Sequence, residues 1–157
     1  MKRSQREGQE FSAVYPSPLG KLRVSGRGKS ISAISMSSRG RLAGKLPLSV
    51  RVSLDLYFKG SGKKGGRFVL EGTPFQKNVW KTLSSIPWGE SISYAELARR
   101  VKRPKAVRAV ANAVGQNPVA VLIPCHRVIG SDGSLTGYAY GLKKKAWLLN
   151  HEKMRRG

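Results

Sequence analysis

The chain has 157 residues, of which 39% are hydrophobic, and this fits one medium domain or two small ones with a buried core. Its 30 Lys and Arg residues outnumber 8 Asp and Glu residues and give a formal net charge of +22. When the chain is divided after Glu71, each part carries 15 basic and 4 acidic residues, so the charge is no detachable tail. A charge this large favours nucleic acid as a partner, with a membrane surface or a generally basic proteome as the alternatives.

The cysteine content and the hydropathy exclude several classes of protein. One cysteine cannot form an internal disulfide, so Cys125 is a buried apolar residue, a reactive thiol or a metal ligand with few companions. No stretch approaches the roughly 20 apolar residues needed to span a bilayer. The N-terminal stretch MKRSQREGQEFSAVYPSPLG lacks the apolar middle of a signal peptide. We therefore expect a cytoplasmic protein that does not bind membranes.

The first half of the chain predicts a small sheet. Residues 11–70 contain the alternating segments FSAVY, LRVSG, SISAISM and VSLDLYF, separated by Gly, Pro and Ser clusters, and this pattern indicates short strands and allows one helix. The Gly-rich basic stretch 59–68 follows as a flexible connection. We place the domain boundary after it, with an N-terminal α/β domain over 1–71 and a mostly helical C-terminal domain over 72–157. The predicted fold class is α+β.

Two capping motifs open the second half. Residues 73–76, TPFQ, offer a threonine N-cap, a proline at the first helical position and a capping-box glutamine. Residues 93–96, SYAE, repeat the capping box with a serine and a glutamate. A third helix is predicted from near Pro104 to Gly115, joined to the second by the tight basic connection RVKRPK. This pattern is typical of a helix-turn-helix whose last helix recognises DNA, although an alanine-rich helix packed in a core is the alternative.

The segments around the cysteine are predicted to converge on it. VAVLI, residues 119–123, is predicted to be a buried strand, and RVIGSDGSLTGY a hairpin that turns at Asp132-Gly133. The segment 142–154 is predicted to be the last helix.

Cys125 and His126 are adjacent in IPCHRV and suggest an activated thiol. A thiol is a useful nucleophile only as thiolate, and a nearby imidazole or positive charge lowers its pKa toward neutrality. Adjacent side chains on extended backbone point apart, so a bridging water is the easier route between them. Glu152 on the last helix is a candidate to orient the imidazole, whereas His151 beside it is predicted to lie at the surface. The alternative is a buried cysteine beside a chance histidine.

The string NPVAVLIPCHRVIGSDG, continued by TGYAYGL and WLLNHE, closely resembles the O6-alkylguanine-DNA alkyltransferases, or methylated-DNA–protein-cysteine methyltransferases. TPFQKNVWKTLSSIPWGESISYAELA and RPKAVRAVANAVGQNP extend the resemblance over residues 72–152. It implies a monomeric DNA repair protein that binds double-stranded DNA in the minor groove and flips out O6-alkylguanine. The alkyl group then passes irreversibly to the protein's own cysteine, with no metal or cofactor, and O4-alkylthymine is a further candidate substrate.

The resemblance also assigns site residues. It makes Cys125 the acceptor, His126 the base acting through water, and Glu152 the carboxylate that orients His126. Asn117 holds the hinge before the active site by hydrogen bonds, and Lys145 matches the family's pocket lysine. On the DNA side, Arg108 enters the base stack, and Tyr94 hydrogen-bonds the flipped guanine and helps to rotate its phosphate. The other expected DNA contacts are Arg103, Lys105, Ala106 and Ala109. The expected pocket comprises the carbonyls of Cys125 and Val128, the wall formed by Tyr138, the amide of Ala139, and the neighbouring Tyr140 and Val114.

Two features depart from the family pattern. Many relatives have two glycines where this chain has Tyr140 and Gly141, so we expect Tyr140 to narrow the pocket entrance. The first half has no His or Cys, which excludes the N-terminal structural zinc of some relatives.

Three other functions compete with alkyl transfer. An alkyltransferase-like protein binds lesions without an acceptor cysteine, and Cys125 argues against it. A helix-turn-helix transcription factor predicts a preferred DNA sequence and no covalent product. A Cys-His hydrolase predicts turnover of ester or amide substrates.

Overall fold

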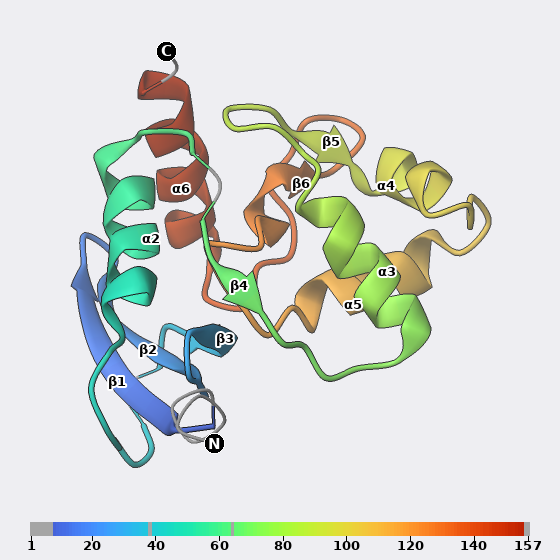
Figure 1. Ribbon diagram of the computed structural model, residues 1–157. Helices are drawn as coiled ribbons and strands as arrows, with labels where there is room; N and C mark the ends of the chain where they lie inside the picture. The colour runs from blue at the N-terminus through green and yellow to red at the C-terminus, as the bar shows by residue number, and fades with distance from the viewer. Residues whose placement is uncertain (1–7, 38, 64, 156–157) are drawn as a thin grey trace. The chain divides into compact units, whose positions relative to one another are not determined.

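The computed structural model describes residues 8–37, 39–63 and 65–155, which form two compact units (Figure 1). The first unit contains the chain through Glu71 together with Pro118–Leu122. The second contains Gly72–Asn117 and the chain from Ile123 onward. The chain therefore leaves the second unit for five residues and re-enters it just before Cys125.

In its described residues, the first unit consists of a four-stranded sheet and one helix (Figure 1). The strands β1 (Glu10–Ser17), β2 (Gly20–Arg27) and β3 (Ser30–Ser35) pair antiparallel in sequence order, and β4 (Arg67–Phe68) pairs parallel to β3. The predicted sheet and the α+β fold class are confirmed.

The fourth segment of the first half, VSLDLYF, forms part of helix α2 (Leu48–Lys59) rather than a strand. Val50, Leu54 and Tyr57 recur at intervals of three and four residues, so helical spacing decides the structure and buries all three side chains. Gly60 ends the helix in the left-handed conformation, with φ 78°. The hydroxyl of Tyr15 on β1 donates to Asp55 of α2 at 2.6 Å, which joins helix and sheet.

The second unit is mostly helical. Its elements are α3 (Pro74–Leu83), β5 (Ile92–Ser93), α4 (Tyr94–Arg100), α5 (Val107–Gly115), the 3-10 turn η1 (Cys125–Arg127), β6 (Val128–Ile129) and α6 (Leu142–Met154). Trp80 of α3 is buried and donates from Nε1 to the carbonyl of Ala113 at 2.9 Å, which ties α3 to α5.

The first predicted capping box is complete, because Thr73 and Gln76 exchange both hydrogen bonds. The second is only half formed. Ser93 accepts from the amide of Glu96 at 3.0 Å, but the Glu96 carboxylate pairs with Arg99 and Arg100 instead. Helix α5 begins at Val107, three residues after the predicted start.

The predictions for 119–123 and for the hairpin are wrong. Residues 119–123 form turns, with one isolated bridge between Val119 and Ile34, because Val121 adopts φ 72° in the left-handed region and this reverses the chain. The chain does turn after Gly130, whose amide donates to the carbonyl of Ser134 at 2.9 Å. However, β6 pairs in parallel with β5, so no hairpin partner strand follows the turn.

Candidate active site around Cys125

A sharp turn positions Cys125 and its two successors. Pro124, with φ −81° and ψ 64°, lets the amide of Cys125 donate to the carbonyl of Ile123 at 2.8 Å. The 3-10 turn η1 then separates the side chains by about a third of a turn each. Cys125 is half-buried, whereas His126 and Arg127 are buried. The tight turn replaces the extended backbone assumed from the sequence.

The approach to this turn is held by Asn117. Its Nδ2 donates to the carbonyl of Ile123 at 2.8 Å, across the segment that belongs to the first unit. Within the first unit that segment is fixed by Ile34, whose amide donates to the carbonyl of Pro118 at 2.9 Å and whose carbonyl accepts from the amide of Ala120 at 3.1 Å. The chain before Cys125 is therefore anchored at both ends.

Glu152 of α6 binds three partners with its carboxylate, because Oε1 also accepts from the amide of Gly89 at 3.3 Å. One oxygen lies 2.5 Å from Nε2 of His126, and the other accepts from Nε of Arg127 at 2.7 Å. An ionised carboxylate only accepts hydrogen bonds, so Nε2 of His126 carries a proton. In the neutral imidazole the lone pair is then on Nδ1, and this nitrogen is the basic one.

The electrostatics of this cluster favour an ionised carboxylate and a neutral imidazole. Burial alone raises the pKa of Glu152, but hydrogen bonds and charge from His126 and Arg127 outweigh it and lower the pKa to about 2. Burial lowers the pKa of His126, and the charges of Arg127 and Lys145 act in the same direction against the opposing effect of Glu152.

Cys125 is not activated in the resting site. Burial raises the pKa of its thiol, and the opposing hydrogen bond from Asn117 and charge of Lys145 do not offset it. Asn117 and Lys145 both lower this pKa, but desolvation of the thiolate outweighs them in the resting protein.

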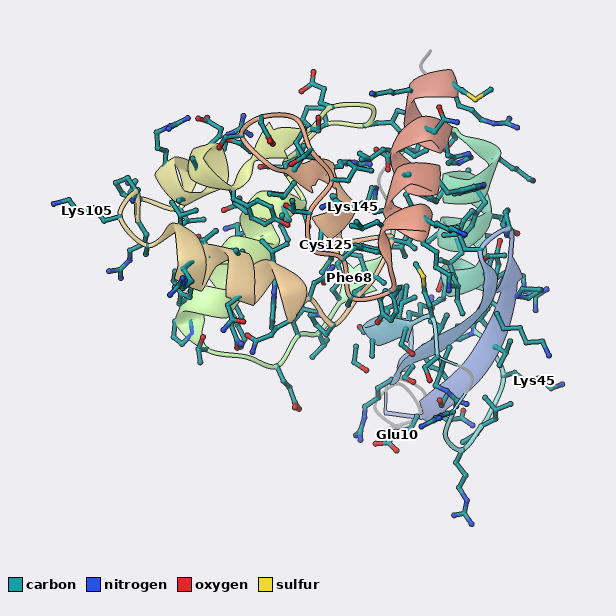
Figure 2. The ribbon with its side chains drawn as sticks, turned by 180° about the vertical axis from the view of Figure 1, so that it is seen from behind. Glu10, Lys45, Phe68, Lys105, Cys125 and Lys145 are labelled. Atoms are coloured by element: carbon teal, nitrogen blue, oxygen red, sulfur yellow. The ribbon has the colours of Figure 1, made fainter. Side chains whose placement is uncertain are left out.

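Lys145, labelled in Figure 2, braces the loop that follows the turn, and Tyr94 does the same. The fully buried Lys145 donates from Nζ to the carbonyls of Thr136 and Gly137 at 2.8 and 3.3 Å. The Tyr94 hydroxyl donates to the same carbonyls at 3.1 and 3.4 Å. Burial lowers the pKa of Lys145. The charge of Lys145 lowers the pKa of Cys125, and the charge of Cys125 adds to burial in raising the pKa of Tyr94.

Aromatic residues follow in the same loop. The rings of Tyr138 and Tyr140 meet edge to face, with centroids 5.8 Å apart. The buried hydroxyl of Tyr138 has no hydrogen-bond partner among the described residues. Burial, and then the charge of Cys125, raise its pKa. Of the other expected pocket residues, Val128 and Val114 are buried and Ala139 is exposed.

The helix-turn-helix consists of α4 and α5 and the basic connection between them. Arg103 and Lys105 are exposed in that connection, and Lys105 extends away from the ribbon (Figure 2). Arg108 and Ala109 are exposed on α5, Ala106 is half-buried at its N-cap, and the opposite face buries Val110, Ala113 and Val114. Helix α5 therefore presents a small-residue face with an arginine to solvent and is not a core helix.

Arg127 is a site residue that the sequence reasoning missed. Besides Glu152, it donates from Nη1 to the carbonyl of Ile86 at 2.5 Å, and its guanidinium lies 5.9 Å from the centre of the Trp88 ring. The available signal was its position in IPCHRV, where an arginine stands between residues that the apolar pattern buries.

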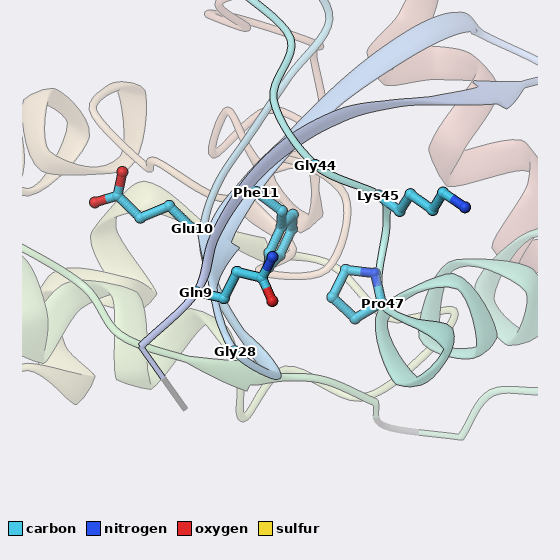
Figure 3. A pocket seen from close by; sticks show the side chains of 7 residues that line it. All are labelled: Gln9, Glu10, Phe11, Gly28, Gly44, Lys45 and Pro47. Carbon is cyan, nitrogen blue, oxygen red and sulfur yellow. The ribbon is translucent and has the colours of Figure 1, made fainter. Parts of the chain in front are cut away.

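The first unit has no comparable chemistry. A surface pocket of about 510 Å³ is lined by Gln9, Glu10, Phe11, Gly28, Gly44, Lys45 and Pro47 (Figure 3). Its charged side chains, Glu10 and Lys45, extend away from each other, and it contains no thiol or imidazole. Among the described residues, no group of three or more His, Cys, Asp and Glu is placed to hold a metal ion. No helix in the described part of the chain is long and apolar enough to cross a membrane.

Fold and site together define a helix-turn-helix protein that carries one thiol next to a buried imidazole–carboxylate pair. Residues 74–154 match the family described as 6-O-methylguanine DNA methyltransferase, DNA binding domain. A methylated-DNA–protein-cysteine methyltransferase from Haemophilus influenzae is 41% identical over 155 residues, or 92% of this chain and 87% of the relative. One from Methanosarcina acetivorans is 38% identical and covers 90% of this chain and 97% of its own.

Solved structures agree. The crystal structure of Mycobacterium tuberculosis O6-methylguanine methyltransferase has a TM-score of 0.86 at 36% identity, covering 95% of this chain and 96% of that chain. A related structure from the same organism, in complex with DNA, has a TM-score of 0.82 at 39% identity and covers 90% and 92%. The chain belongs to the methylated-DNA–protein-cysteine methyltransferase family.

Proposed function

We propose that this protein repairs O6-alkylguanine in duplex DNA by transferring the alkyl group to Sγ of Cys125, once per molecule. The observation that carries the proposal is the only cysteine of the chain, which follows a tight turn and precedes a buried histidine whose basic nitrogen is set by a carboxylate. Family membership supports the same reaction.

The chemistry needs only groups of this chain and a water. The thiol proton passes through a water to Nδ1 of His126, and the electron pair stays on sulfur. The thiolate attacks the alkyl carbon, the S–C bond forms, and the bond from that carbon to guanine O6 breaks. The electron pair of the broken carbon–oxygen bond goes to the guanine, and protonation then restores the normal base. Since the thioether is stable, the thiol is not regenerated and the protein reacts once.

The raised pKa of the resting thiol suits this sequence of events. A protonated thiol reacts slowly with oxidants and stray electrophiles, because the thiolate is the nucleophile. Activation then depends on His126 accepting the proton when substrate is bound. Glu152 contributes by fixing which imidazole nitrogen is basic.

On the DNA side, α5 enters the minor groove. Exposed Ala109 lets the helix backbone approach the duplex, and Arg108 occupies the space in the stack that the flipped nucleotide vacates. Flipping costs a few kcal/mol, which phosphate contacts from a protein of charge +22 offset. Tyr94 turns from the loop carbonyls to the guanine and its phosphate, and Arg103, Lys105 and Ala106 complete the contact.

The flipped base lies against the loop after η1. The carbonyls of Cys125 and Val128 accept from its amino group, and the Ala139 amide donates to the alkylated oxygen. The remaining pocket residues are Tyr138 as a wall, Tyr140 at the entrance, Val114 behind, and Asn117 and Lys145 as supports. The protein acts as a cytoplasmic monomer, and O4-alkylthymine is its second substrate.

The test is intact-protein mass spectrometry after incubation with a duplex that contains one O6-methylguanine, followed by peptide mapping. We expect one methyl group on Cys125, stoichiometric and without further turnover, and none on Cys125→Ser, which keeps its affinity for DNA. Tight binding without an adduct on the native protein would instead identify a lesion-binding protein with a silent thiol.

A further inference from the structure

Arg127 completes a buried cluster with His126 and Glu152. The side chain of Arg127 is 10% exposed, and those of His126 and Glu152 are 0% and 1% exposed. We propose that Arg127 is a positioning residue that neutralises Glu152 and thereby keeps the His126 imidazole uncharged, ready to accept the Cys125 proton at neutral pH. This inference rests on the proposed alkyl transfer to Cys125.

His126 and Arg127 bind different oxygens of Glu152, and the oxygen bound by Arg127 also accepts from the amide of Gly89. His126 Nε2 lies 2.5 Å from Oε2 of Glu152, and Arg127 Nε lies 2.7 Å from Oε1. Two further contacts hold the guanidinium in place, the carbonyl of Ile86 at 2.5 Å and the ring of Trp88 at 5.9 Å. Arg127 therefore cannot leave the carboxylate without giving up three interactions at once.

A count of charges gives the consequence. An arginine side chain stays protonated in proteins, and among the residues that the structure describes Glu152 is the only buried carboxylate. If His126 were also protonated, one buried anion would face two buried cations, and an uncompensated buried charge is costly. The neutral imidazole avoids this cost. A histidine and a carboxylate alone would instead favour an imidazolium, which has no lone pair to accept a proton.

The remaining charge that acts on His126 works in the same sense, because the positive charge of Lys145, on α6, also lowers the pKa of the imidazole. Helix α3, which also packs against η1, carries only the exposed cations Lys77 and Lys81. The lowered pKa of His126, caused first by burial and opposed by Glu152, agrees with this picture.

The direct test is the protonation state of His126, read from ¹⁵N chemical shifts of histidine in the labelled full-length protein. The chain has two histidines, so a His151→Asn variant assigns the signals. We expect the native protein at pH 7 to show a neutral imidazole protonated at Nε2. An imidazolium signal in the native protein would overturn the proposal.

The same NMR measurement on variants of Arg127 distinguishes the effect of its charge from that of its hydrogen bonds. Arg127→Gln keeps donors for Glu152 and for the Ile86 carbonyl but removes the charge, and we expect it to raise the pKa of His126. The acid limb of the single-turnover rate, measured with saturating O6-methylguanine duplex, then moves up by at least about one pH unit, so transfer at a pH below both limbs slows about tenfold. Arg127→Lys restores the charge and the position of the limb. Lys81→Met, which removes an exposed cation, is the control.

The outcomes are distinct. If Arg127→Gln shows the native acid limb and the native histidine spectrum, Arg127 has only a structural role. The proposed alkyl transfer to Cys125 would be unaffected by that result. Absence of transfer by the native protein would instead overturn the proposed function, and the histidine spectrum would still test the charge state. If Arg127→Gln does not fold, the Arg127→Lys variant is the test. This variant keeps the positive charge, so an acid limb of its transfer rate that lies about one pH unit above the native one would contradict the electrostatic role.

Discussion

Replacing Glu152 by glutamine removes the negative charge at the centre of the buried cluster. An amide has one acceptor and two donors, whereas His126 and Arg127 both present donors to this side chain. The amide oxygen can satisfy Arg127 only if the amide nitrogen faces Nε2 of His126. The imidazole must then move its proton to Nδ1, which removes the basic lone pair. We therefore expect Glu152→Gln to slow alkyl transfer by about 10²-fold or more.

The stability change follows from the pKa of Glu152. This pKa is about 2 in the folded protein against an ordinary value of 4.5, a difference that corresponds to about 3 kcal/mol of stability. Because the folded-state pKa is the lower one, the unfolded chain binds more protons between the two values. The contribution is complete above pH 4.5 and is lost as the pH falls toward 2. At pH 3 about 2 of the 3 kcal/mol is gone.

The assay is urea unfolding of native protein and Glu152→Gln between pH 7 and pH 3. All three tryptophans, Trp80, Trp88 and Trp147, lie in the second unit, so their fluorescence reports on it. We expect a difference in unfolding free energy of about 3–5 kcal/mol at pH 7, because Arg127 loses its partner, and a difference about 2 kcal/mol smaller at pH 3. Glu90→Gln, at an exposed position, controls for the loss of one negative charge. A difference that is constant across this pH range would refute the reasoning.

Three further predictions concern residues outside that cluster. Arg108→Ala should slow alkyl transfer from a lesion in duplex DNA by a larger factor than it raises the Kd for undamaged duplex, because the side chain replaces the flipped base. Equal factors for the transfer rate and the Kd would show that Arg108 contacts a phosphate instead. Tyr140→Gly should increase inhibition by bulky O6-substituted free guanines, and equal inhibition of variant and native protein would remove its role at the entrance. Lys102 has φ 62° at the end of α4, so Lys102→Gly should raise stability by about 1 kcal/mol in thermal unfolding while Lys102→Ala, equally strained, should not. Equal gains in stability for Lys102→Gly and Lys102→Ala would instead indicate relief of charge repulsion in the basic connection.

The local signals in the second half were strong enough to predict its helices. Thr73 and Gln76 form the expected capping box because both partners lie within one turn of each other. The same rule predicted a second complete capping box, which forms only in part because two arginines on the same helix bind the Glu96 carboxylate. The sequence allowed one helix in the first half but did not place α2, because a short segment of alternating residues satisfies both periods and only burial of Val50, Leu54 and Tyr57 decides between them.

By itself, the sequence determined the fold class, the family resemblance and the identity of the thiol, because these depend on residue types and on spacings within one helix or one motif. Only the tertiary structure decided how the site is charged. Glu152 lies 25 positions after Arg127, yet its carboxylate meets both Arg127 and His126. The segment before Cys125 is reversed at Val121, whose left-handed conformation no propensity predicts for a β-branched residue. Burial, which raises the pKa of the thiol and lowers that of the imidazole, is a property of packing between distant segments and cannot be read from any one of them.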